Sequence, residues 1–190
     1  MTEAKIYIKK PAIEEIYAFV SQKPRLECEG QLKGEKIKKL NENKLLYIVE
    51  CTVPYGYSKR TPNSVQTDNG SRKRSEFSLF YKKIGEYHSH VTSIMQKNGE
   101  KYEDIARVKF SKSDKEFLKE SPKNIELVIA IRKIEVKKKI SNDNPMLISF
   151  YVGKNEIYRV DIGGYYCDPL NSKIRRASLD APEKVLRGLA

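Results

Sequence analysis

The fold class rests first on one apolar run, Lys44-Leu-Leu-Tyr-Ile-Val-Glu-Cys-Thr-Val53. Its β-branched and aromatic residues are typical of a strand. Residues 25–39 predict a second strand, and the Asn41-Glu-Asn43 stretch between the two predicts a turn. The two strands therefore form a predicted hairpin, from which we work outward along the chain.

The flanking sequence mixes helices with strands. Pro11 stands where a helix begins, and apolar residues follow it at helical spacing, so 11–22 predicts a short helix. The same reasoning predicts helices over 76–83 and from Ser111 onward, and strands over 84–88, 124–132, 146–152 and 157–162. The last stretch, 168–190, carries a helix start at Asp180 and Pro182 and has no assigned place. Because helices and strands are mixed without strict alternation, we expect an α+β or α/β fold around one sheet.

Length and charge narrow the class of protein. The chain has 190 residues, with 37 Lys and Arg against 25 Asp and Glu, hence a net charge of +12. This length predicts one domain. The charge indicates a nucleic-acid partner, an acidic protein partner or a lysine-rich proteome. The stretch 54–75 lacks periodicity and is longer than most loops in compact domains, so it is either disordered or functional.

The expected location is cytoplasmic. No apolar run approaches the roughly 20 residues that span a membrane, and the first residues lack the apolar segment of a signal peptide. Three cysteines, Cys28, Cys51 and Cys167, form no Cys-x-x-Cys pair. Neither a disulfide framework nor a cysteine zinc site is therefore expected, and Cys28 and Cys51 are expected to be inert thiols in strands.

The first candidates for a functional site are the only two histidines of the chain, in Gly85-Glu-Tyr-His88-Ser-His90. On an extended segment, residues i and i+2 point to the same face, so both rings can reach one metal ion. A catalytic zinc site usually takes a third protein ligand. Asp114, at the head of the predicted helix in Ser111-x-x-Asp114, is the candidate, and Asp104 is its rival.

A hydrolytic metal site also needs a carboxylate that acts as a base. Glu27 is the candidate, in Glu27-Cys-Glu-Gly30-Gln-Leu32-Lys-Gly34, and Glu29 is its competitor. The glycines in this predicted strand indicate a bulge or a close approach of backbones.

Together these pieces resemble the JAMM (MPN-plus, JAB domain) zinc metallopeptidases, deubiquitinase-like isopeptidases. The pattern of that family is a glutamate ahead of a Gly-x-Leu-x-Gly strand, then His-Ser/Thr-His, then Ser-x-x-Asp, and all three parts occur here in that order. The resemblance implies that Glu27 is the general base, since it stands three residues before Gly30. It also implies that one catalytic Zn²⁺ is bound by His88, His90 and Asp114, and that Ser111 stabilises the oxyanion.

The resemblance covers roughly residues 11–162 and carries further expectations. It implies a single domain over 1–165, with a curved central mixed β-sheet flanked by helices and polar insertions at 54–75 and 91–110. Residues 166–190 are then a C-terminal extension. The implied activity is hydrolysis of the peptide or isopeptide bond after the C-terminus of a ubiquitin-like protein, with that modifier or its conjugate as the partner.

Two features depart from the family pattern. Val91 follows the second histidine, where the family usually has proline. The separation of His90 and Ser111 is 111 − 90 = 21 positions, which is longer than is usual in the family and is most simply explained by an insertion within 91–110. Asp114 is preferred to Asp104 because it alone has the Ser-x-x-Asp context.

Two alternatives belong to other classes of protein. A nucleic-acid-binding module is indicated by the charge and by the basic and aromatic residues of Tyr55-Gly-Tyr-Ser-Lys-Arg60, although no known nucleic-acid motif is present. A catalytically silent scaffold of the same family is the other, although such scaffolds usually lose the ligands that this chain has. Because the excess charge lies largely in 54–75, 132–139 and 173–187, outside the metal motif, it is more consistent with solubility or with steering an acidic protein partner.

Overall fold

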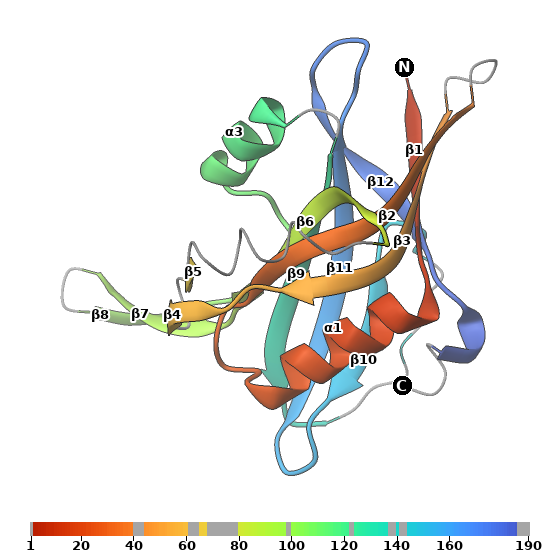
Figure 1. Ribbon diagram of the computed structural model, residues 1–190. Coiled ribbons are helices and arrows are strands. Elements are labelled where there is room, and N and C mark those ends of the chain that lie inside the picture. The colour runs from red at the N-terminus through yellow and green to blue at the C-terminus, as the bar shows by residue number, and fades with distance from the viewer. Residues whose placement is uncertain are drawn as a thin grey trace.

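The computed structural model describes residues 2–39, 44–60, 65–67, 80–97, 100–121, 124–136, 140 and 144–185, most of which are strands (Figure 1). The strands of the main sheet are β1 (Glu3–Ile8), β2 (Glu29–Lys39), β3 (Lys44–Pro54), β6 (Lys82–Val91), β9 (Ile125–Ile134), β10 (Ile148–Val152), β11 (Ile157–Cys167) and β12 (Ile174–Asp180). Two separate hairpins are β4 (Tyr57–Arg60) with β5 (Val65–Thr67), and β7 (Ser93–Lys97) with β8 (Glu100–Asp104). The helices with described bounds are α1 (Lys10–Gln22) and α3 (Lys112–Glu120), and residues 183–185 are also helical.

The main sheet closes on itself. Its strand order is β10-β11-β12-β1-β3-β2-β6-β9, and β11 also pairs with β9. Along one edge of β11, its first part pairs with β10 and its last residues pair with β12, while the other edge pairs with β9 from Ile157 to Tyr166. Seven strands, β11, β12, β1, β3, β2, β6 and β9, therefore form a closed β-barrel, with β10 attached to β11.

The expected α+β fold, a central mixed sheet flanked by helices, is wrong. The chain is mostly β, and its sheet is a closed barrel. Closure needs the parallel pairing of β12 with β1, in which Lys5 lies opposite Ser178. The seven residues of β12 read Ile-Arg-Arg-Ala-Ser-Leu-Asp, and such a polar segment has no strong strand signal. The predicted domain boundary between residues 165 and 166 falls within β11.

The core fills the inside of the barrel. Alternate side chains of β9, Leu127, Ile129 and Ile131, face inward and belong to the largest buried apolar cluster. The predicted helix over 11–22 is confirmed as α1, which packs against β3 and β10 and adds Ile13 and Ile16 to the same cluster. Because α1 contributes to this core, it is part of the barrel's packing rather than a cover for one face of an open sheet.

Other local predictions have mixed outcomes. The hairpin of the first two strands is confirmed, with β2 and β3 antiparallel, although β2 begins only at Glu29. The strands predicted over 124–132, 146–152 and 157–162 correspond to β9, β10 and β11. The predicted helix over 76–83 is wrong at its end, since β6 starts at Lys82. Its first part, over 76–79, lies outside the described residues, as does the predicted turn at 41–43.

The two polar stretches contain hairpins where they are described. Strands β4 and β5 fall within 54–75, and β7 and β8 fall within 91–110. Within the described ranges, no helix is both long and apolar enough to cross a membrane.

Candidate metal centre

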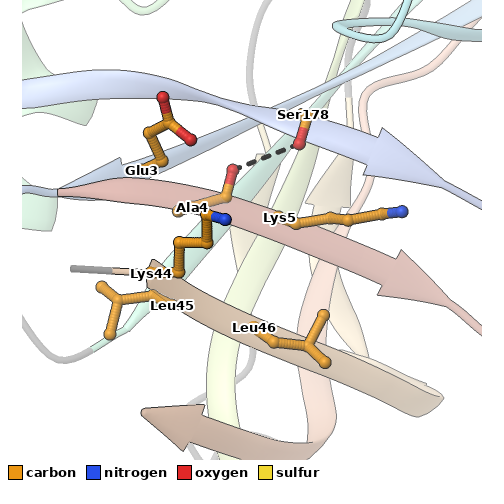
Figure 2. Close-up of a pocket in the computed structure, with 7 residues that line it drawn as sticks. All are labelled: Glu3, Ala4, Lys5, Lys44, Leu45, Leu46 and Ser178. Atoms are coloured by element: carbon orange, nitrogen blue, oxygen red, sulfur yellow. Dashed lines mark hydrogen bonds between the residues drawn. The ribbon is translucent and has the colours of Figure 1, made fainter. Parts of the chain in front are cut away.

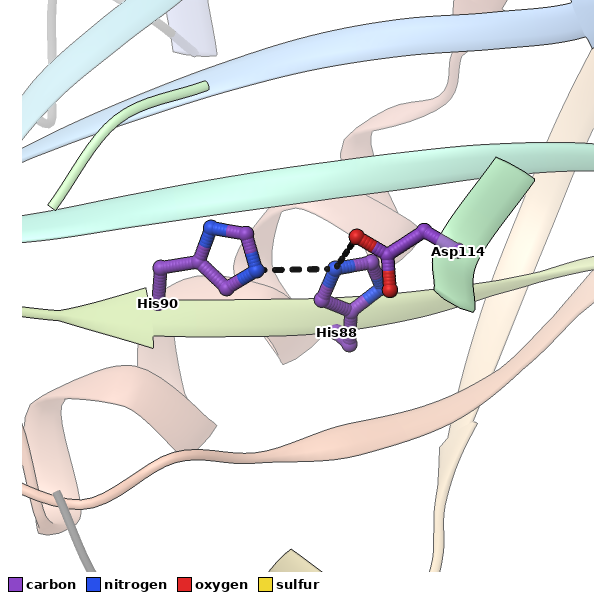
Figure 3. Close-up of side chains that lie close together, drawn as sticks. All are labelled: His88, His90 and Asp114. Atoms are coloured by element: carbon purple, nitrogen blue, oxygen red, sulfur yellow. Dashed lines mark hydrogen bonds and ion pairs between the residues drawn. The ribbon is translucent and has the colours of Figure 1, made fainter. Parts of the chain in front are cut away.

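Strand β6 places the two histidines on one face. His88 and His90 are two residues apart on the strand, so their side chains project to the same side of the sheet. This is the outer side of the barrel, because Tyr87, between Glu86 and His88, belongs to the inner core cluster. The two Nε2 atoms lie 3.2 Å apart (Figure 3).

Each histidine is oriented through its other ring nitrogen. Nδ1 of His88 lies 2.7 Å from Oε1 of Glu126 on β9, and Nδ1 of His90 lies 3.1 Å from the backbone carbonyl oxygen of Arg107. A carboxylate and a carbonyl can only accept, so Nδ1 of each ring donates. In the neutral rings both Nε2 atoms then carry lone pairs that face each other. A proton or a cation between them relieves this repulsion.

The pKa values of the two rings move in opposite directions. Burial alone lowers the pKa of His88, but the hydrogen bond with Glu126 and the nearby carboxylates of Asp114 and Glu27 raise it overall. The pKa of His90 is lowered, first by burial and then by the neighbouring His88. One ring therefore takes a proton more readily than the other, which fits a pair that shares one cation.

Asp114 joins the histidines from the start of α3. The Ser111 hydroxyl accepts a hydrogen bond from the Asp114 backbone N–H at 3.2 Å, and the Ser111 N–H donates to Oδ2 of Asp114 at 2.7 Å. This reciprocal pair is a capping box, which fixes the first turn of the helix. It holds Oδ2 of Asp114 3.6 Å from Nε2 of His88 (Figure 3).

The donor set suits a zinc ion. The candidate ligand atoms of His88, His90 and Asp114 all lie within 4.8 Å of one another. Tetrahedral zinc with ligands at about 2.0–2.1 Å separates neighbouring donors by roughly 3.4 Å. The observed separations of 3.2 Å between the Nε2 atoms and 3.6 Å between His88 and Asp114 are close to that value.

Glu27 lies just before β2 and is tied to β6 by its neighbour. The backbone N–H of Cys28 donates to the Ser89 hydroxyl at 2.8 Å, and the Ser89 N–H donates to the Cys28 carbonyl at 2.8 Å. The pKa of Glu27 is raised to about 7, chiefly by burial, with Asp114 and Glu29 adding to the rise and His88 opposing it. A carboxyl with a pKa near neutrality can both take up and release a proton.

The rival residues have different positions. Asp104 ends β8, opposite Ser93, and is not part of the group of ligand atoms that could share an ion. Glu29 pairs with His88 across the β2–β6 ladder, so it also stands beside the histidines. Sequence reasoning missed Glu126, although a single charged residue within the apolar run from Ile125 to Ile131 was a signal for it.

The barrel and this cluster define the molecule as a closed β-barrel that carries two histidines and an aspartate together on its outer face. No protein-family model and no curated protein matches the sequence. The chain is similar in structure to the solution structure of protein DSY2949 from Desulfitobacterium hafniense, with a TM-score of 0.53 and 16% identity over 94% of this chain and 93% of that chain. At this identity the likeness shows a shared fold alone.

Two surface pockets lie away from the cluster. One, of about 330 Å³, is formed where β1, β3 and β12 run together, and the Ser178 hydroxyl there lies 3.4 Å from the Ala4 carbonyl oxygen (Figure 2). The other, of about 640 Å³, lies at the start of β6 beside the exposed Phe80 and Tyr81. Neither pocket is lined by a histidine or a cysteine. The candidate function therefore rests on the His88, His90 and Asp114 cluster.

Proposed function

We propose that this protein is a zinc-dependent metallopeptidase that hydrolyses the peptide or isopeptide bond after the C-terminus of a ubiquitin-like protein. The observation that carries the proposal is the meeting of His88, His90 and Asp114 ligand atoms within 4.8 Å, in the order of the JAMM pattern. The proposal rests on the site and not on the fold, because one fold can carry many activities.

The residues have separate roles in the proposed reaction. His88, His90 and Asp114 would hold the ion, which supplies Lewis acidity toward a carbonyl oxygen and a water molecule. Glu27 accepts a proton from the attacking water, and the new C–O bond replaces the C–N bond. The same proton then passes from Glu27 to the departing amine nitrogen. Ser111 is assigned to stabilise the carbonyl oxygen as it becomes negative.

The proposed substrate, the C-terminal tail of a ubiquitin-like protein, is suggested by the resemblance to the JAMM family and by the hairpins near the site. An extended C-terminal tail can add to a strand through main-chain hydrogen bonds, which suits residues without side chains such as a diglycine. Hairpin β7–β8 leaves β6 directly after the histidines, and with β4–β5 it is proposed to frame the tail. The net charge of +12 favours an acidic protein partner.

The proposed location is the cytoplasm. The three cysteines, Cys28, Cys51 and Cys167, are not joined in a disulfide. Free thiols are usual where the compartment is reducing.

Zinc analysis combined with a cleavage assay tests the proposed function. The full chain is expected to bind one zinc ion and to cleave a ubiquitin-like protein fused through its C-terminal diglycine. Glu27→Gln should abolish cleavage and keep the zinc, because the change removes a base but no ligand. Glu29→Gln is the matched control, and it should retain cleavage.

The ligand assignment is tested in the same preparation. Asp114→Asn should lose zinc, because an amide is a poor replacement for a carboxylate ligand, whereas Asp104→Asn should keep it. A wild-type chain that binds no zinc but binds DNA or RNA in a salt-sensitive manner would contradict the proposed function in favour of the nucleic-acid alternative. A chain that binds zinc and cleaves nothing would favour the silent scaffold.

A further inference from the structure

We propose that Glu126 is a positioning residue of the metal centre, which fixes the tautomer and the direction of His88 so that Nε2 points at the ion. This inference rests on the proposed function, since it requires a metal at the cluster. It goes beyond the pattern of motif residues, because Glu126 is in none of its three parts.

The position of Glu126 calls for a specific reason. It lies on β9, 38 positions from His88 in the chain, and its side chain is only 6% exposed. Its neighbours Ile125 and Leu127 belong to the apolar core. Burial of a carboxylate is costly unless it is paired, and burial raises the pKa of Glu126 accordingly. Its bond with Nδ1 of His88 is the pairing that offsets this cost.

The second oxygen of Glu126 adds no hydrogen bond to the barrel among the residues that the structure describes. Oε2 is buried and makes no hydrogen bond within the described part of the chain. A buried polar atom that lacks a partner costs about 1–3 kcal/mol. If this position served only to stabilise the barrel, an apolar residue would do so better. A residue that orients His88 as a metal ligand must instead keep its carboxylate.

The bond itself has a direct effect on metal binding. A carboxylate that accepts from Nδ1 selects the neutral tautomer whose Nε2 carries the lone pair, and it makes Nε2 more basic and so a better metal ligand. The two histidines differ in this respect, because His90 is oriented by a neutral backbone carbonyl, that of Arg107. Of the two histidines, His88 is therefore the one whose Nδ1 is hydrogen-bonded to a charged group.

The surroundings of His88 assist the same orientation. The ring of Phe110 lies 6.4 Å from that of His88 between centroids, and Phe110 stacks on Tyr165 at 4.0 Å. These rings form an apolar side of the site, and the Tyr165 hydroxyl donates to the Val108 carbonyl oxygen at 2.9 Å. Of the described groups around the ring, Glu126 is thus the one that selects which nitrogen faces the ion.

Metal affinity of the full-length protein tests this inference without reference to catalysis. Zinc affinity is measured by competition with a chromogenic chelator, and the visible absorption of the Co²⁺ form reports the ligand environment. Glu126→Gln keeps the shape of the side chain and removes its charge, so zinc should bind about 10- to 100-fold more weakly and the Co²⁺ bands should shift. The matched control is Glu86→Gln. Glu86 lies opposite Glu126 on β6 but bonds to Tyr55 and Lys83 and not to His88, so zinc affinity should change far less than in Glu126→Gln.

The outcomes separate this inference from the proposed function. If the wild type binds zinc and Glu126→Gln binds it equally well with the same Co²⁺ bands, the role of Glu126 is refuted and the proposed function stands. A wild type that binds no zinc removes the proposed function itself. Glu126→Asp is the second variant should Glu126→Gln fail to fold. Aspartate keeps the charge, but its shorter side chain does not extend to Nδ1 of His88. Weaker zinc binding with normal folding therefore supports the positioning role, whereas unchanged zinc affinity and Co²⁺ bands overturn that role.

Discussion

At the scale of single residues, Glu27 has surroundings that disfavour its charge. Its pKa is raised from 4.5 to about 7, mainly because the carboxyl is buried and secondarily because Asp114 and Glu29 lie near it, with His88 opposing the rise. In the metal-free protein the folded chain therefore holds this proton at pH values where the unfolded chain has lost it. By linkage, the contribution of Glu27 to stability declines as the pH rises from about 4.5 to about 7.

Replacement by a neutral amide should remove this dependence. In the metal-free protein, Glu27→Gln is expected to raise the free energy of unfolding at pH 8 by about 1–2 kcal/mol, a value reduced for solvent screening of a partly exposed group. At pH 4 the variant and the wild type should be equally stable. Urea denaturation at the two pH values measures the effect. A difference between variant and wild type that is the same at both pH values would contradict the raised pKa.

At the scale of elements, the site depends on how β2 and β6 are joined. The predicted bulge or close approach in the glycine-containing strand is confirmed, since the β2 register shifts beside Lys33 against both β3 and β6. A Cβ atom on Gly34 would lie 1.9 Å from the Ile48 carbonyl oxygen, a distance that excludes any side chain there. Glycine at this position thus permits β3 to approach β2, the strand that follows Glu27.

Ser89 joins the same elements by a side chain. Its hydroxyl is buried and accepts from the Cys28 N–H, so Ser89→Ala removes this buried hydrogen bond and should lower the free energy of unfolding by about 1–3 kcal/mol. Cleavage should also slow, because one of the two hydrogen bonds that tie Cys28, the neighbour of Glu27, to β6 is lost, while zinc content stays unchanged. Equilibrium denaturation, zinc analysis and turnover of the fusion substrate check the three parts.

A hydroxyl away from the site provides the control for this variant. Ser178 makes a long 3.4 Å contact with the Ala4 carbonyl oxygen (Figure 2), so Ser178→Ala should affect neither stability nor turnover to a comparable degree. Equal losses in both variants would show that Ser89 has no particular role in placing Glu27.

At the scale of the whole molecule, barrel closure depends on the last described strand. β12 pairs with β11 on one side and with β1 on the other, and its Ala177 and Leu179 belong to the core. A chain that stops after Asp168 lacks β12 and leaves two strand edges and the core open to water. We expect it to show no cooperative thermal unfolding transition and no zinc binding, as measured by circular dichroism and metal analysis.

A longer truncation is the control for closure. A chain that stops after Val185 retains every described strand and should unfold cooperatively, as the full chain does. The chain that stops after Asp168 could instead unfold cooperatively with the same thermal midpoint as the full chain. In that case β12 does not contribute to the folded core as its pairing indicates.

An element of the fold could be predicted from the sequence where it depends on local residues. The helix α1, the β2–β3 hairpin and the capping box of α3 follow from proline placement, strand composition and a Ser-x-x-Asp spacing, all of which act within a few residues. The helix predicted over 76–83 was wrong where it is described, because Lys82 and Lys83 pair with β2 in a sheet. Sheet pairing there overrides local preference.

The sequence by itself determined which side chains are candidates for chemistry, since His88 and His90 share a face on any strand and Asp114 follows a capping serine on any helix. Only the tertiary structure decided that the barrel closes, that β12 is part of it and that Glu126 orients His88. The physical reason is that each of these depends on contacts between strands far apart in the chain, such as Lys5 with Ser178 and Glu126 with His88. Such contacts are chosen by the packing of the whole core, and no local pattern encodes them.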